Sequence, residues 1–141
     1  MYWLACGAMS AERATYLDSS AIVKLAIVEP QSAALRRYLR RRRPLVSSAL
    51  ARTEVGRALL PFGDKAVRRG FAVLARLELL RVSDRVLDAA ARFQPAGLRS
   101  LDAIHLATAQ QLGSDLASVV TYGDQMSLAA QASGWTVLAP T

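Results

Sequence analysis

The sequence predicts an α/β fold, a three-layer arrangement in which helices cover both faces of a parallel sheet of four to five strands. Short strand-like runs alternate with amphipathic helical runs from residue 14 to the end, which is typical of such sheets. The 141 residues are 52% hydrophobic, enough for one domain with a core. We expect this domain over residues 14–141, after an N-terminal extension, residues 1–13, that could be disordered.

The first half of the domain is predicted to hold two strands and four helices. Prolines mark the ends of helices in this half, because the residue before a proline disfavours helical backbone. Pro30 and Pro44 each end a helix, and Pro61 with Gly63 makes a turn between two more. The expected elements are a strand at 14–17, helices at 18–28 and 31–43, a strand at 45–47, and a helical hairpin at 48–60 and 64–77.

The second half repeats the alternation with three strands and three helices. Ser83 or Asp84 is placed to cap one helix and Ser100 to cap the next, since short polar side chains accept hydrogen bonds from free N–H groups. A Pro95–Gly97 break separates these two helices. The expected elements are strands at 79–82, 117–121 and 135–138 and helices at 85–93, 101–112 and 125–132.

Four of the eleven acidic residues stand at strand ends or on inward helix faces: Asp18, Glu54, Asp102 and Asp124. Open parallel sheets bind ligands at the carboxyl ends of their strands. Two carboxylates at about 4 Å repel by roughly 4 kcal/mol at an effective dielectric near 20, so clustered acids imply a cation. An oxygen-only ligand set indicates Mg²⁺ or Mn²⁺, and such a site is what a metal-dependent nuclease needs.

Each aspartate of this set also has a structural interpretation as a helix cap. An acid at a helix N-terminus stabilises the helix by roughly 0.5–2 kcal/mol, and taken singly capping is the better explanation. Asp64 and Asp84 fill ordinary capping positions without the preceding strand. Glu54 caps nothing and shares a helix face with Ala51 and Ala58, so it needs a buried partner. Convergence of the four acids in the fold favours a metal site over separate capping roles.

These acids lie in four sequence blocks: YLDSSAIVKL from residue 16, TEV from residue 53, LDAIHLATA from residue 101 and TYGD from residue 121. In order and spacing the blocks resemble those of PIN-domain ribonucleases, specifically VapC-type toxins of toxin–antitoxin pairs, across residues 14–138. The resemblance implies an Mg²⁺- or Mn²⁺-dependent endoribonuclease, a homodimer and a VapB-like antitoxin. It also implies Asp18, Glu54, Asp102 and Asp124 as its acidic quartet.

Residues around the quartet carry further hypotheses. TYGD is one residue longer than the usual T-x-D, so Asp124 is either displaced or reaches the metal through water. Hydroxyls of Ser20 and Thr121 could contact metal-bound water or phosphate, and local helix-start bonds are an equal alternative. His105 is the sole histidine, without His or Cys companions for zinc, and is interpreted as structural. The residues do not decide between one metal ion and two.

The chain carries a net charge of +7 with a pI near 10.5, which favours a polyanionic partner such as RNA. The densest basic run comprises Arg36, Arg37 and Arg40–Arg43, and either RNA backbone contact or a solvated helix face explains it. With one cysteine and no run of about 18 apolar residues, we expect a soluble, cytoplasmic protein without disulfides.

Other functions fit less well. A receiver-type signalling domain needs a late lysine, and none follows Lys65. A D-x-D phosphatase motif fails at Ser20, and a D-x-S-x-S adhesion site fails at Ile22. The alternative that remains is a catalytically inactive, basic nucleic-acid-binding or scaffold protein, in which the acids are caps only and no metal binds.

Overall fold

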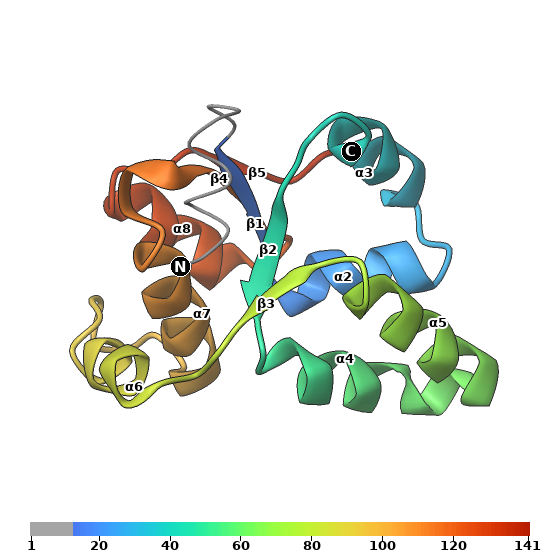
Figure 1. Ribbon diagram of the computed structural model, residues 1–141, viewed down its shortest axis with the longest axis horizontal. Helices are drawn as coiled ribbons and strands as arrows, with labels where there is room; N and C mark the ends of the chain where they lie inside the picture. Colours follow the sequence, from blue (N-terminus) through green and yellow to red (C-terminus); the bar gives the residue numbers. More distant parts are fainter. Residues whose placement is uncertain (1–12) are drawn as a thin grey trace.

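A computed structural model describes residues 13–141 and contains a five-stranded sheet in which every strand pair is parallel (Figure 1). The strands are β1 (Ala14–Leu17), β2 (Leu45–Ser48), β3 (Glu78–Leu80), β4 (Leu116–Val120) and β5 (Val137–Leu138). Their order across the sheet is β3-β2-β1-β4-β5. The predicted fold class is confirmed, with five strands.

Helices cover both faces of this sheet. One face packs against α2 (Ser19–Ala26), α3 (Ser32–Leu39), α4 (Ala51–Leu59) and α5 (Asp64–Leu74), through a core that includes Leu17 and Val120. The opposite face packs against α7 (Ser100–Gln110) and α8 (Asp124–Ala132), through a core that includes Tyr16 and Val119, and α6 (Asp84–Ala91) packs on α7. Figure 1 shows the two groups of helices on either side of the strands. Because neighbouring strand residues point to opposite faces, each strand contributes to both cores.

The strand order reverses between β1 and β4. From β1 the chain passes to β2 and β3 on one side, and β4 and β5 lie on the other. The backbone N–H of Asp18 donates to Val120 O at 3.2 Å, which ties the carboxyl ends of β1 and β4 together. In open α/β sheets this switch point forms the crevice where ligands bind.

Several predicted element ends are wrong. The second helix was predicted to reach Arg43, but α3 ends at Leu39 and Arg40–Arg43 form the connection to β2. Pro44 restricts the backbone before it, and arginines three or four positions apart, such as Arg36 with Arg40 and Arg40 with Arg43, would repel one another along a longer helix. Arg99 rather than Ser100 caps α7, and β5 covers only half of the predicted strand. The predicted N-terminal extension lies outside the described residues except for Arg13, whose Nε donates to Ser114 O at 3.1 Å.

The predicted helical hairpin consists of α4, a 3-10 turn at Leu60–Phe62, and α5. Its inward face is in the core: Leu59 and Leu74 are buried. The outward apolar side chains Leu60, Phe62 and Phe71 are more than half exposed at 56%, 62% and 51%. Within residues 13–141 no helix has the length and apolar character needed to cross a membrane.

Candidate active site

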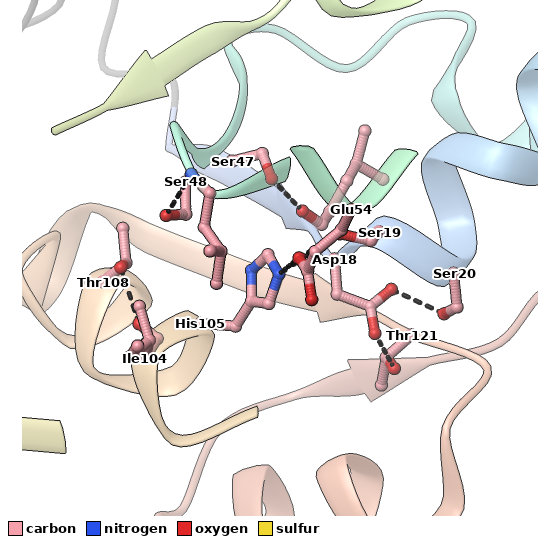
Figure 2. A network of polar contacts seen from close by, with 12 residues as sticks. Asp18, Ser19, Ser20, Ser47, Ser48, Glu54, Ile104, His105, Thr108 and Thr121 are labelled. Carbon is pink, nitrogen blue, oxygen red and sulfur yellow. Dashed lines mark hydrogen bonds and ion pairs between the residues drawn. The ribbon is translucent and has the colours of Figure 1, made fainter. Parts of the chain in front are cut away.

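Asp18 is buried at the switch point, directly after β1, and its carboxylate is held by three donors (Figure 2). Oδ1 accepts from the Ser20 hydroxyl at 2.6 Å and from the Ala21 N–H at 3.1 Å, so Asp18 also caps α2. Oδ2 accepts from the Thr121 hydroxyl at 2.6 Å, from the end of β4. The two predicted hydroxyls therefore bind the carboxylate itself and fix its orientation.

Glu54 points from α4 towards His105 of α7, and the two side chains are in contact. His105 Nε2 lies 2.6 Å from Glu54 Oε1, and the Ser19 hydroxyl donates to the same oxygen at 2.5 Å. Burial opposes ionisation of Glu54, but the hydrogen bond and charge of His105, with the Ser19 bond, lower its pKa. The expectation that this half-buried acid has a partner is confirmed.

His105 is buried and bridges Glu54 to Tyr16 of β1. Its Nδ1 lies 2.7 Å from the Tyr16 hydroxyl. A carboxylate can only accept, so Nε2 carries the proton shared with Glu54, and in the neutral ring Nδ1 accepts from Tyr16. The chain Tyr16–His105–Glu54 thus joins the core of the sheet to an acidic side chain of the quartet.

Asp102, in the first turn of α7, is electrostatically coupled to two of the other predicted acids. Burial raises its pKa, and the charges of Asp18 and then Glu54 raise it further against the opposing effects of His105 and Arg99. The charges of Asp18 and Glu54 thus act on Asp102, although the three residues come from separate parts of the chain.

Asp124 is the first residue of α8, and its side chain is exposed. The preceding Gly123 N–H donates to the Thr121 hydroxyl at 3.1 Å, so the backbone before Asp124 is bound to the same threonine that holds Asp18. Within residues 13–141 no hydrogen bond joins the Asp124 side chain to the other acids.

The residues present fit a hard divalent cation by their chemistry. Three carboxylates with oxygen donors only, two of which raise the pKa of the third, form a site whose repulsion a cation would offset. As the side chains stand, no group of three His, Cys, Asp or Glu residues in the described part of the chain is arranged to hold an ion. Asp18 and Glu54 instead direct their oxygens at hydroxyls and at His105.

Five of the six predicted RNA-contact arginines line one or both of two clefts. One, of about 420 Å³, lies among α2, α3, β2 and α5, with Arg36, Arg40, Arg43 and Arg76 around aliphatic side chains; we term it the α3 cleft. The other, of about 380 Å³, lies at the amino ends of β1 and β4. We term this the amino-end cleft, and its charged residues are Arg13 and Arg41–Arg43. Arg37 is exposed and lines neither cleft.

The sequence model of the PIN domain matches residues 15–131 of this chain. The chain belongs to the PIN-domain family. It is 62% identical to ribonuclease VapC46 of Mycobacterium tuberculosis over 128 residues, which cover 91% of this chain and 98% of that protein. It is 40% identical to ribonuclease VapC35 of the same species, over 89% of this chain and 96% of the relative. The resemblance to PIN-domain ribonucleases of the VapC type is thereby confirmed.

Solved structures agree on the fold. VapC20 of M. tuberculosis, described as a sarcin-ricin loop cleaving toxin, superimposes with a TM-score of 0.72 at 16% identity, covering 89% of this chain and 99% of that one. A toxin–antitoxin complex from Klebsiella pneumoniae gives a TM-score of 0.68 at 21% identity, covering 90% and 98%. These likenesses support the three-layer PIN architecture.

Three residues at the site were not singled out from the sequence or were given a smaller role than the structure shows. Ser19 and Tyr16 were not singled out, and His105 was interpreted as structural without any link to an acid. Position offered a signal for two of them: Tyr16 lies two residues before Asp18 on a strand, and His105 three residues after Asp102 on a helix. The partnership of His105 with Glu54 joins residues 51 positions apart and required the folded chain.

Proposed function

We propose that this chain is the endoribonuclease toxin of a toxin–antitoxin pair and that Asp18, Glu54 and Asp102 hold a catalytic Mg²⁺ or Mn²⁺. The 62% identity to a ribonuclease across nearly the whole chain supports the activity. The observation that carries the site is the convergence of three acids from β1, α4 and α7 at the switch point of the sheet, with Asp102 and its charged neighbours repelling one another. PIN-domain nucleases in general depend on divalent metal.

When bound, the cation would supply an activated water and offset charge on the scissile phosphate. The protein groups have separate tasks. Thr121 and Ser20 hold the Asp18 carboxylate in one orientation, and His105 with Ser19 keeps Glu54 ionised and aimed. Asp102 supplies the carboxylate that most needs a cation, because its neighbours raise its pKa. Asp124, at the edge, is assigned to orienting water rather than to direct ligation.

The test is cleavage of a labelled RNA by purified protein after EDTA treatment, with Mg²⁺, Mn²⁺ or Ca²⁺ added back. Cleavage should return with Mg²⁺ or Mn²⁺, because oxygen ligands of this kind suit both ions. Cleavage that persists in EDTA would contradict a metal-dependent mechanism. Isothermal titration of Mn²⁺ into the protein gives a second readout that does not depend on activity. No binding there, together with no cleavage, would support the inactive alternative.

We also propose that the antitoxin binds the α3 cleft. Its aliphatic lining, including Leu25, Leu39 and Val73, offers a surface for the apolar face of a helix, and the surrounding arginines favour acidic side chains beside that face. Val73 of α5 lines the cleft, so the cleft adjoins the helical hairpin. Leu59 and Leu74 of that hairpin are in the core and are not available to a partner.

Co-expression with the cognate antitoxin, followed by co-purification, measures this interaction. Arg36→Glu with Arg40→Glu should reduce co-purification, because each change replaces attraction by repulsion of an acidic segment. The matched variant is Leu60→Glu with Phe71→Glu, which alters only exposed residues of the hairpin. If the first variant still co-purified with the antitoxin and the second did not, the antitoxin would bind at the hairpin rather than in the α3 cleft. The homodimer that the resemblance implies is measured by light scattering of the toxin alone.

A further inference from the structure

The amino-end cleft is a second charged site, at the opposite end of the sheet from the acids. It opens beside Thr15 of β1 and Ser118 of β4, which pair in register, whereas Asp18 and Thr121 follow the carboxyl ends of the same two strands. Thr15 and Asp18 are three positions apart along an extended chain, a rise of about 10 Å. The chemistry of the acidic site therefore does not explain the composition of this cleft.

Among residues 13–141, the ion pairs Lys24–Glu29, Arg68–Asp64 and His105–Glu54 do not involve an arginine of the cleft. Three of the cleft arginines contact backbone oxygens. Arg13 Nη2 donates to Leu116 O at 2.5 Å, Arg43 Nη1 donates to Leu39 O at 3.3 Å, and Arg42 donates to Tyr38 O. These bonds hold the guanidinium groups against neutral acceptors, which carry no full negative charge.

An aromatic ring and hydroxyl groups complete the lining. The Arg42 guanidinium lies over the Tyr38 ring, 3.7 Å from its centroid, and the Tyr38 hydroxyl lies 3.3 Å from the buried Ser118 hydroxyl. Single-stranded nucleic acids are bound by this combination: cations for the phosphates, flat groups for the bases and hydroxyls as additional donors.

We propose that the amino-end cleft binds the phosphodiester backbone of single-stranded RNA, outside the nucleotides that are cut. The proposal rests on the proposed ribonuclease function and adds a second point of attachment for the same substrate. The α3 cleft differs in its apolar lining, which includes aliphatic side chains such as Leu25 and Val73. Ala117 is the one aliphatic residue in the lining of the amino-end cleft, which fits a polyanion better than an apolar protein segment.

The distance between the two sites sets the expected behaviour. RNA that occupies both must pass around the molecule from one end of the sheet to the other, so it must extend several nucleotides beyond the cleavage point. A very short oligonucleotide reaches the acids alone. The cleft should therefore change the affinity for long RNA and leave the cleavage of short RNA unchanged.

The experiment compares two double variants with equal loss of charge. Arg41→Ser with Arg42→Ser removes two cleft arginines, and Arg69→Ser with Arg85→Ser removes two exposed arginines of α5 and α6 that line neither cleft. Binding is measured in the Asp18→Asn background, where the RNA stays intact, with a single strand of about 20 nucleotides, longer than typical sites of ~4–16. A third variant, Arg41→Lys with Arg42→Lys, keeps the charge.

The cleft variant should lose about tenfold in affinity for the long RNA. The slope of log affinity plotted against log salt concentration should become shallower by about 1, since each phosphate contact contributes ~0.7 to that slope. The Arg69→Ser with Arg85→Ser control should show smaller changes in both the affinity and the salt slope. The lysine variant should have the salt slope of the protein with both arginines. Cleavage of an oligonucleotide of about 4 nucleotides, below most binding-site sizes, should be equal in all.

Equal salt slopes in the two serine variants would overturn the proposal, as would an equal loss on short and long RNA. Loss of antitoxin binding with RNA affinity unchanged would assign the cleft to a protein and also overturn it. Binding is measured without cleavage, so the two proposals fail separately. A protein that does not cut RNA with any metal, yet shows the slope difference, retains the RNA-binding cleft and loses the nuclease assignment.

Discussion

The two ends of the sheet differ in how their charged groups are held. At the carboxyl ends, Asp18 and Glu54 are at least half-buried, and each accepts short hydrogen bonds from hydroxyls or an imidazole. At the amino ends, Arg41–Arg43 are exposed, and their guanidinium contacts are to backbone oxygens and the Tyr38 ring. Fixed, partly desolvated acids suit metal chemistry, and accessible cations suit a mobile polyanion. The comparison predicts that catalysis and RNA affinity can be removed separately.

The largest effect should come from Asp18→Asn, which removes one charge where three acids converge. Cleavage should fall by about 100-fold or more, since loss of outer partners in metal sites already costs ~10–100-fold. RNA affinity should be retained, because the amino-end arginines are unchanged. Asp84→Asn, at the exposed first residue of α6, is the matched control and should cleave normally. A large loss of RNA affinity in Asp18→Asn would break the proposed separation of the two ends.

A smaller effect is expected from Tyr16→Phe, which removes the hydroxyl that contacts His105 Nδ1. His105 then holds Glu54 less firmly, and the Mg²⁺ concentration for half-maximal cleavage should rise by about tenfold. The Michaelis constant for RNA should not change. Tyr38→Phe makes the same chemical change at the amino end and should leave the Mg²⁺ requirement unaltered. If the Tyr16→Phe protein had normal Mg²⁺ dependence, the Tyr16–His105 contact would contribute to core packing only and not to the metal site.

Asp102→Asn should reduce cleavage as Asp18→Asn does, and its separate, smaller effect should be to stabilise the metal-free fold at neutral pH. Burial and the charges of Asp18 and Glu54 raise the pKa of Asp102, so its ionised form is favoured less in the folded chain than in the unfolded one. Asparagine removes that cost. The gain should be present at pH ~7 and disappear below the usual Asp pKa of about 4, where both states are protonated. Thermal unfolding in EDTA at several pH values measures it; a lower melting temperature at neutral pH would contradict the repulsion.

The smallest effect is expected from Asp124→Asn. The side chain is exposed, and no described hydrogen bond joins it to the other acids, so most of the cleavage rate should remain. The protein should be slightly less stable, because a negative charge at the start of α8 complements the helix dipole by roughly 0.3–1 kcal/mol. A loss of cleavage as large as that of Asp18→Asn would make Asp124 a full member of the metal site. Rates at saturating Mg²⁺ and melting curves separate the two contributions.

Local patterns in the chain predicted most of the fold. The strand at 14–17 and the helices around 19–26 and 101–110 follow from hydrophobic periodicity bounded by polar caps and prolines, which act over a few residues. Asp18 could be placed at the switch point because it directly follows the first strand. Element ends were less well predicted: α3 stops at Leu39, since charge repulsion among Arg40–Arg43 and the restriction before Pro44 together outweigh arginine's good helix propensity.

By itself, the sequence determined the alternation of strands and helices, the four acidic blocks and the excess of arginine. These features depend only on composition or on residues that are close together in the chain. Only the tertiary structure decided which charges meet. Tyr16, Glu54 and His105 form one chain of contacts across three elements, and the arginines of the basic run line two clefts. The physical reason is that these interactions join residues far apart in sequence, and their geometry depends on how helices pack onto the sheet.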